Sequence, residues 1–280
     1  SFTRRETSPY VNRIRLMWLQ MREPILADFR PPPGLPKTIA AYMKRVSDAF
    51  VTDAYHSLSI AGYRVSRALI ERVRSGRWNP DVSEEDREQR NAMAARGYWR
   101  AHQAVQKSLE NAKGDNAGRV VDDDHREWYR ELFAPSVTAG LLKPSDLAGY
   151  RNAQVFIRRS MHVPLNPEAL RDAYLDLLRE EAHPAVRVVP GHFIFVYIHP
   201  YFDGNGRIGR FLMNVTMALG RIPWTVVPVQ DRSRYVEALE RASVDIRPFT
   251  ALLAKLVRKG IAGEPLPAVP EASTDATGWE

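Results

Sequence analysis

The stretch HPYFDGNGRIGR, His199 to Arg210, contains a histidine, a carboxylate, two glycines that flank an asparagine, and two arginines three residues apart. The apolar run HFIFVYI precedes it, and a second run with apolar residues at helical spacing follows it. Glycine reaches backbone angles that strain other residues. The pattern therefore predicts a tight turn between two buried helices in a mainly α-helical protein.

The glycines and arginines of this stretch predict an anion site. Successive amides at Gly204, Asn205 and Gly206 can turn inward as a nest for an anion, and the helix that begins near them adds unpaired N–H groups. Arg207 and Arg210 stand at i and i+3, so both project from the first turn of that helix. Two guanidinium groups beside a nest suit a polyphosphate.

The carboxylate and the histidine predict chemistry on that polyphosphate. Asp203, just before the nest, can hold Mg²⁺ against phosphate oxygens, whereas a calcium loop would need further acids at alternate positions. His199 can take a proton from an attacking hydroxyl group, a contribution of about 10²–10⁴-fold in such reactions. His192, among apolar residues, is predicted to be structural.

The twelve residues resemble the signature of the Fic family, H-P-F-x-D-G-N-G-R-x-x-R, and differ from it only by Tyr201 in place of phenylalanine. The resemblance extends over residues 149–256 and more weakly back to residue 37. Fic proteins typically move AMP from ATP to a hydroxyl group of a target protein. The resemblance therefore implies a Fic-type helical bundle with a small β-hairpin flap.

The resemblance also implies roles for individual residues. His199 would be the base that deprotonates a target Tyr, Thr or Ser, and Asp203 would hold Mg²⁺. Gly206 favours nucleotidyl transfer, because the branch of the family that phosphorylates its targets carries lysine there. The implied nucleotide-binding residues are Gly204, Asn205, Gly206, Arg207, Arg210 and, on the adenine side, Tyr235.

Residues 154–163 are typical of a short hairpin with its turn at residues 158–159. The family's flap docks the backbone of a target by strand addition, so a target protein is the expected partner. The alternative is a hairpin that only covers the core. The candidate docking residues are Val155, Phe156, Ile157, Met161, His162 and Val163.

A second motif, SLSIAG at residues 57–62, resembles the inhibitory helix S/T-x-x-x-E-G/N of many Fic proteins. Ser57 and Gly62 match, but Ala61 stands where the glutamate that blocks the second signature arginine is expected. A methyl group cannot pair with Arg210. The motif therefore predicts a de-inhibited enzyme, whether the alanine is engineered or natural, unless SLSIAG is only a helix end.

Composition sets wider limits. The formal net charge of +7 selects no class of partner, and nucleic acid is not indicated. The absence of cysteine excludes disulfides and thiolate sites and fits a cytoplasmic protein. We also expect neither a membrane span nor a signal peptide. The predicted regions are an N-terminal helical region (1–115) with the inhibitory-type helix (37–62), a Fic core (116–262) and a disordered tail (263–280).

The expected activity is that of a protein adenylyltransferase, with ATP as substrate and Mg²⁺ as cofactor. Two alternatives stay open at this point: transfer from another nucleotide donor, and a non-catalytic module on the same fold. The sequence is also compatible with self-modification and with a homodimer, but it identifies neither the target nor an interface.

Overall fold

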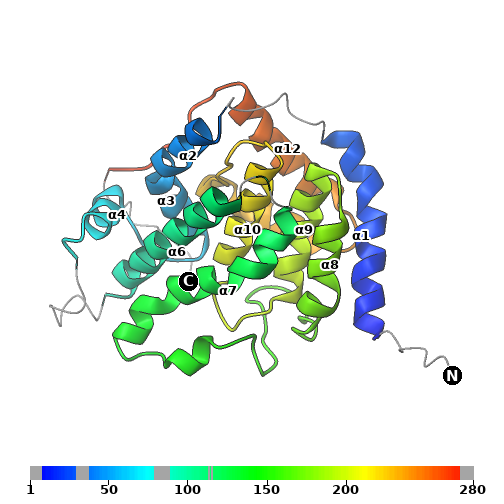
Figure 1. Cartoon of the computed structure of the whole chain (residues 1–280), viewed down its shortest axis with the longest axis horizontal. Coiled ribbons are helices and arrows are strands. Elements are labelled where there is room, and N and C mark those ends of the chain that lie inside the picture. Colours follow the sequence, from blue (N-terminus) through cyan, green and yellow to red (C-terminus); the bar gives the residue numbers. More distant parts are fainter. Residues whose placement is uncertain (1–7, 30–37, 79–88, 113, 115, 272–280) are drawn as a thin grey trace.

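The computed structural model describes residues 8–29, 38–78, 89–112, 114 and 116–271. Helices make up most of them (Figure 1), and within these ranges no strand is present. The helices are α1 (Pro9–Asp28), α2 (Ile39–Asp48), α3 (Phe50–Ile60), α4 (Arg67–Arg74), α6 (Arg90–Ala112), α7 (Ala117–Thr138), the 3₁₀ turn η1 (Pro144–Leu147), the π-helical turn η2 (Leu170–Tyr174), α8 (Leu175–Glu180), α9 (Pro184–Ile198), α10 (Asn205–Leu219), the 3₁₀ turn η3 (Val229–Asp231), α11 (Arg232–Arg241) and α12 (Arg247–Ile261).

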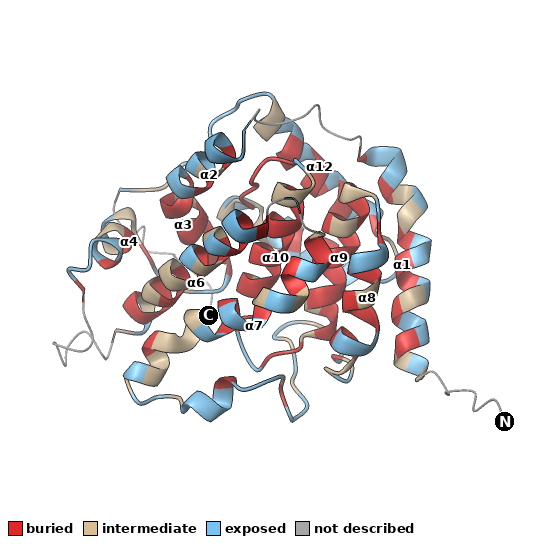
Figure 2. Cartoon of the chain, in the orientation of Figure 1, coloured by how far each residue is buried: buried red, intermediate tan, exposed pale blue. Residues whose placement is uncertain are grey.

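Helices α9 and α10 form the centre of the bundle, as their buried colouring in Figure 2 shows. Most residues of both helices are buried, as expected for helices enclosed by others; α9 is apolar around nearly its whole circumference, whereas α10 also buries Arg207, Arg210 and Asn214. Helices α1, α7 and α12 pack against this pair. The turn between α9 and α10 carries the HPYFDGNGRIGR stretch, so the most buried part of the fold positions its end residues. Within the described residues, no helix is long and apolar enough to cross a membrane.

Helices α6 and α7 lie side by side next to the central pair (Figure 1). Their contact is closest at Gly97, where a Cβ atom would lie 1.9 Å from the carbonyl oxygen of Leu132. Only glycine fits there without moving one of the helices. The neighbouring Phe133 reaches the turn between α9 and α10, since a Cβ atom on Gly204 would meet its ring at 2.9 Å. The spacing of α6 and α7 therefore helps to set the shape of that turn.

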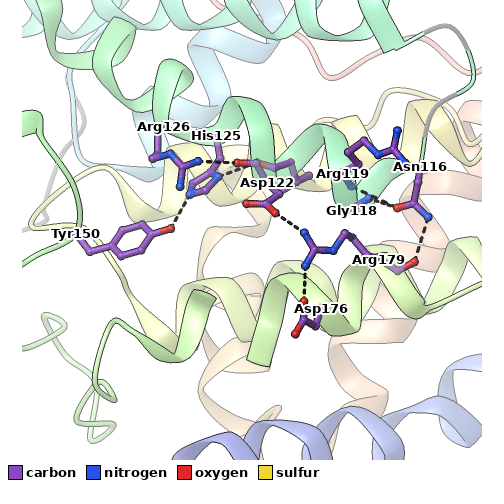
Figure 3. Close-up of polar contacts among 10 residues, drawn as sticks. Asn116, Gly118, Arg119, Asp122, His125, Arg126, Tyr150, Asp176 and Arg179 are labelled. Atoms are coloured by element: carbon purple, nitrogen blue, oxygen red, sulfur yellow. Dashed lines mark hydrogen bonds and ion pairs between the residues drawn. The ribbon is translucent and has the colours of Figure 1, made fainter. Parts of the chain in front are cut away.

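A polar network fixes the start of α7 against α8 (Figure 3). Asn116 caps α7, because its side-chain oxygen accepts from the N–H of Gly118 at 2.8 Å. Its amide nitrogen donates to the carbonyl oxygen of Arg179 at 3.0 Å. The guanidinium of Arg179 in turn contacts Asp122 on α7 and Asp176 on α8. These contacts hold together two helices that flank the central pair.

The flap differs from its prediction. Residues 154–163 contain a turn but no strand, so the predicted β-hairpin is wrong for this structure. The N–H of Ser160 donates to the carbonyl oxygen of Ile157 at 3.1 Å, which closes the turn. The N–H of Met161 donates at 2.8 Å to the carboxylate of Glu240 on α11. The backbone donor that a second strand would need is thus taken by a side chain.

The predicted helix over residues 37–62 also differs in detail. It is two helices, α2 and α3, with a break at Ala49, which is in the α region but with ψ near −10°. Residue 37 lies outside the described residues. Helix α3 ends at Ile60, and Gly62 follows with a φ of +91°, the left-handed geometry that favours glycine after a helix.

The tail predicted to be disordered from residue 263 is ordered in part. Residues 264–271 form an extended segment in which proline restricts the backbone. The carbonyl oxygen of Ala268 accepts from Nε2 of His56 on α3 at 3.1 Å, and Val269 packs against the core. Residues 272–280 lie outside the described part of the chain. The segment therefore binds the outer side of the inhibitory-type helix.

Candidate functional site

The turn between α9 and α10 is closed by Asn205. Its side-chain oxygen accepts from the N–H of Tyr201 at 2.9 Å, and its amide nitrogen donates to the carbonyl oxygen of Tyr201 at 2.8 Å. Gly204 has a φ of +76° and precedes the first residue of α10. The predicted nest thus lies at a helix start, where N–H groups lack intrahelical partners. The side chain of Asn205 shapes the loop, which leaves its backbone N–H for an anion.

His199 ends α9 in a left-handed conformation with a φ of +53°. Its Nδ1 lies 3.3 Å from the carbonyl oxygen of Val196, so Nδ1 carries the proton and Nε2 keeps its lone pair. Partial burial lowers the pKa of His199 to about 4. The imidazole is therefore neutral near pH 7 and can accept a proton at Nε2.

Asp203 lies at the mouth of the turn with its side chain largely exposed. One oxygen, Oδ1, accepts from the N–H of Gly204 at 2.6 Å and lies 3.5 Å from Nη2 of Arg207. No cluster of three metal-ligating side chains is found among the described residues. A single exposed carboxylate nevertheless fits Mg²⁺, which proteins often bind by one or two carboxylates together with substrate phosphates.

Arg207 is buried between two aromatic rings. Its Cζ lies 5.0 Å from the ring centroid of Tyr63 and 5.4 Å from that of Phe133. Its exposure is 3%, and its Nε lacks a hydrogen-bond partner. Cation–π contacts hold the plane of such a guanidinium without using its N–H donors. Arg207 can therefore present N–H groups to a phosphate.

Arg210 is held by Ser57, from the inhibitory-type helix. Its Nε donates to Oγ of Ser57 at 2.8 Å, and its Nη2 donates to the carbonyl oxygen of Ser57 at 2.9 Å. Its remaining terminal nitrogen faces Gly206, where a Cβ atom would approach Nη1 to 3.2 Å. Ala61 lies one helical turn after Ser57 and is exposed in the same cleft. Arg210 thus has a serine partner and no carboxylate in contact among the described residues.

These groups line one cleft of about 480 Å³. His199, Asp203, Arg207 and Arg210 all border it, as does Ala61. The structure thus brings together the predicted base, metal ligand and both phosphate arginines.

Known proteins resemble this chain in sequence and in fold. The family model described as Fic/DOC matches residues 121–217. The chain contains a Fic/DOC family domain. The protein adenylyltransferase Fic of Nematostella vectensis is 38% identical over 150 residues, which cover 51% of this chain and 33% of that protein. The protein adenylyltransferase fic-1 of Caenorhabditis elegans is 28% identical over 227 residues, 77% of this chain and 41% of that protein. The chain thus spans less than half the length of either relative.

Solved structures show the same fold. A segment of Fic-1 from C. elegans superposes with a TM-score of 0.62 at 23% identity, covering 89% of this chain and 71% of that one. A Fic domain containing signaling protein from Bacteroides thetaiotaomicron gives a TM-score of 0.56 at 18% identity, covering 93% of this chain and all of that one. The Fic fold therefore extends well beyond residues 121–217.

Tyr235 borders the cleft of the Fic domain but is bonded into the core. Its exposure is 2%, and its hydroxyl lies 2.5 Å from Nε2 of His192. Nδ1 of His192 donates to the carbonyl oxygen of Gly209 at 2.8 Å, so Nε2 accepts from the tyrosine. Burial lowers the pKa of His192 to about 3, which keeps it neutral. The buried position of His192 agrees with the predicted structural role, and the burial of Tyr235 leaves little of its ring accessible to a nucleotide.

Sequence reasoning missed Arg151, which joins the flap to the turn between α9 and α10. Its Nε donates to the carbonyl oxygen of His199 at 2.7 Å, and its Nη1 donates to that of Ala153 at 3.1 Å. Its Nη2 contacts the carbonyl oxygens of Leu165 and Ile198. The exposure of Arg151 is 4%. Its position in GYRN, just before the flap, is the only sequence signal, and it does not predict these contacts.

The flap presents apolar side chains to solvent. Phe156 is 78% exposed, Met161 93% and Val163 53%, whereas Val155 and Ile157 are half-buried. His162 faces inward, stacks on Tyr197 with ring centroids 3.8 Å apart, and donates from Nε2 to the carbonyl oxygen of Tyr197 at 2.7 Å. The predicted docking residues thus comprise three exposed side chains, two half-buried ones and His162, which anchors the flap.

Proposed function

We propose that this chain is a protein adenylyltransferase, which transfers AMP from ATP to a hydroxyl side chain of a target protein. The observation that carries the proposal is the neutral His199, whose free Nε2 lies in the same cleft as Arg207 and Arg210. The names of the relatives support the same activity.

In the proposed reaction, the target hydroxyl oxygen forms a bond to the α-phosphorus of ATP, and its proton passes to Nε2 of His199. The bond between the α-phosphorus and the oxygen that bridges to the β-phosphate breaks, so that pyrophosphate leaves. Arg207 and Arg210 stabilise the negative charge of the phosphates. Mg²⁺, held by Asp203 and the phosphates, would supply further charge neutralisation when bound.

Two further parts of the proposal concern partners. We infer that a target docks on the exposed side of the flap, because Phe156 and Met161 present apolar surface beside the cleft. We also infer that the enzyme is de-inhibited, because Ala61 borders the cleft without a carboxylate for Arg210. A cytoplasmic location remains a prediction that rests on the absence of cysteine.

The test is intact-mass spectrometry of the protein, and of candidate targets in a lysate, after incubation with Mg²⁺ and ATP. We expect the mass of one AMP to appear on the protein itself or on a target, and His199→Ala to abolish it. Parallel incubations with UTP, GTP and CTP test the alternative donors. If no nucleotide gives a mass change and the variant behaves like the parent, the chain is a non-catalytic Fic-like module instead.

A further inference from the structure

Arginines outside the signature also border the cleft, namely Arg90, Arg158, Arg159 and Arg232, and of these Arg90 shares an aromatic ring with Arg207. Cζ of Arg90 lies 4.9 Å from the ring centroid of Tyr63, the ring that Arg207 approaches to 5.0 Å. Arg90 borders the same cleft as Arg207 and Arg210. Two guanidinium groups therefore lie near one tyrosine ring. Asp203 lies 3.5 Å from Arg207 but neutralises only one of these positive charges, so a bound anion would further favour the arrangement.

Tyr63 follows α3 and Arg90 begins α6, and hydrogen bonds to the backbone join these two helix ends. The N–H of Tyr63 donates to the carbonyl oxygen of Leu58 at 3.0 Å, in the turn that ends α3. The side-chain oxygen of Asn91 accepts from the N–H of Arg64 at 3.1 Å. These bonds join the end of α3 to the start of α6, where Arg90 is the first residue. The site is thus built from two helix ends.

Arg90 is exposed, and within the described part of the chain no carboxylate lies within ion-pair distance of it. Arg100, later on the same helix, pairs with Glu131 at 2.6 Å. The cleft also holds two carboxylates: that of Asp203 lies 3.5 Å from Arg207, and that of Glu240 accepts from the flap at Ser160 and Met161. Among the described residues, no carboxylate therefore competes with a ligand for the guanidinium of Arg90, which borders the cleft together with Arg207 and Arg210.

We propose that Arg90 is a third phosphate-binding arginine, which contacts the terminal phosphates of the nucleotide that Arg207 and Arg210 bind. The proposal rests on the proposed function, because it takes a nucleoside triphosphate as the ligand. An acidic segment of a target is a weaker candidate, since Arg90 adjoins Arg207 through one ring, whereas the exposed apolar side chains for docking are on the flap.

The test compares the binding of a non-hydrolysable ATP analogue, with Mg²⁺, and of adenosine by calorimetry. Arg90→Ala is expected to weaken binding of the triphosphate about tenfold, the loss of one hydrogen bond between charged groups, and to leave binding of adenosine unchanged. Arg90→Lys should retain part of the affinity. Arg64→Ala is the matched control, because Arg64 is exposed nearby but does not border the cleft.

Several results would overturn the proposal. They are triphosphate affinity in Arg90→Ala equal to that of the parent, an equal loss for adenosine, an equal loss in Arg64→Ala, or a parent that binds no triphosphate. Transfer of AMP, measured by mass after separate incubation of the same protein preparations with Mg²⁺ and ATP, separates this proposal from the proposed function. Unchanged affinity with intact transfer contradicts only the role of Arg90, while a tenfold loss in a protein that transfers no AMP contradicts only the activity.

Discussion

Replacement of Arg151 should damage both the stability and the activity of the protein. Arg151→Ala would leave the carbonyl oxygens of His199, Ile198, Ala153 and Leu165 without this donor. Each such hydrogen bond contributes on the order of 1 kcal/mol to the free energy of unfolding. Bonds to one side chain are not additive, so we expect a loss of about 3 kcal/mol, which lowers Tm by roughly 6–12 °C.

The effect on activity should exceed the effect of stability alone. His199 has a left-handed backbone, which is unfavourable for a residue with a Cβ atom and persists only if its surroundings hold it. Without the bond from Arg151, the backbone of His199 can relax and move Nε2 away from the target hydroxyl. We expect the rate of AMP transfer to fall at least about tenfold, a part of the contribution of a general base, at a temperature where the variant is still folded.

The assays are thermal unfolding followed by fluorescence and AMP transfer followed by mass. Arg151→Lys should be intermediate in both, because one ammonium group cannot reach all four carbonyl oxygens. Arg158→Ala, at an exposed position on the flap, is the control and should change Tm little. The reasoning is refuted if Arg151→Ala unfolds within about 2 °C of the parent and transfers AMP at the same rate.

Three further perturbations follow from the site. Ala61→Glu should suppress AMP transfer, because its carboxylate can pair with Arg210 and exclude a phosphate. Ala61→Gln is the uncharged control. Equal activity of the two variants would exclude electrostatic inhibition. Because the pKa of His199 is lowered to about 4, the base is neutral above that pH, so kcat/KM should fall only as the pH drops toward 4; an acid limb centred near 6.5, the ordinary histidine value, would contradict this. Glu240→Ala should release the flap, because it removes the carboxylate that accepts from Ser160 and Met161. Trypsin should then cleave faster after residues 158 and 159, with little change in Tm. An unchanged cleavage rate would show that contacts other than those of Glu240 hold the flap.

The sequence predicted the catalytic turn well, because the requirements there are local. Glycine at residue 204, two arginines three apart and an apolar helix on each side leave few conformations, and the structure has the expected turn at the expected place. The start of α7 was less predictable. Its cap is Asn116, whose side chain also bonds to α8, a contact that the local sequence does not indicate.

Contacts between distant segments were beyond sequence reasoning. Arg151 and His199 are 48 residues apart, and Arg210 and Ser57 are 153 residues apart. Helical periodicity shows which face of a helix is buried but not which partner meets it. The prediction for the flap failed for a related reason. Its β-branched and aromatic residues favour strands, whereas Glu240 on α11 accepts from the N–H of Met161.

The close approach of α6 and α7 at Gly97 bears on how members of this family are sorted by their signature. Any side chain at Gly97 would displace Leu132 and the adjoining Phe133, the ring on which Arg207 rests. A Gly97 variant would keep all twelve residues from His199 to Arg210, but Arg207 would no longer be positioned to bind the phosphate of the proposed reaction. A search that inspects only the signature would class such a protein as active. An intact signature therefore indicates activity only when the spacing between α6 and α7 is also intact.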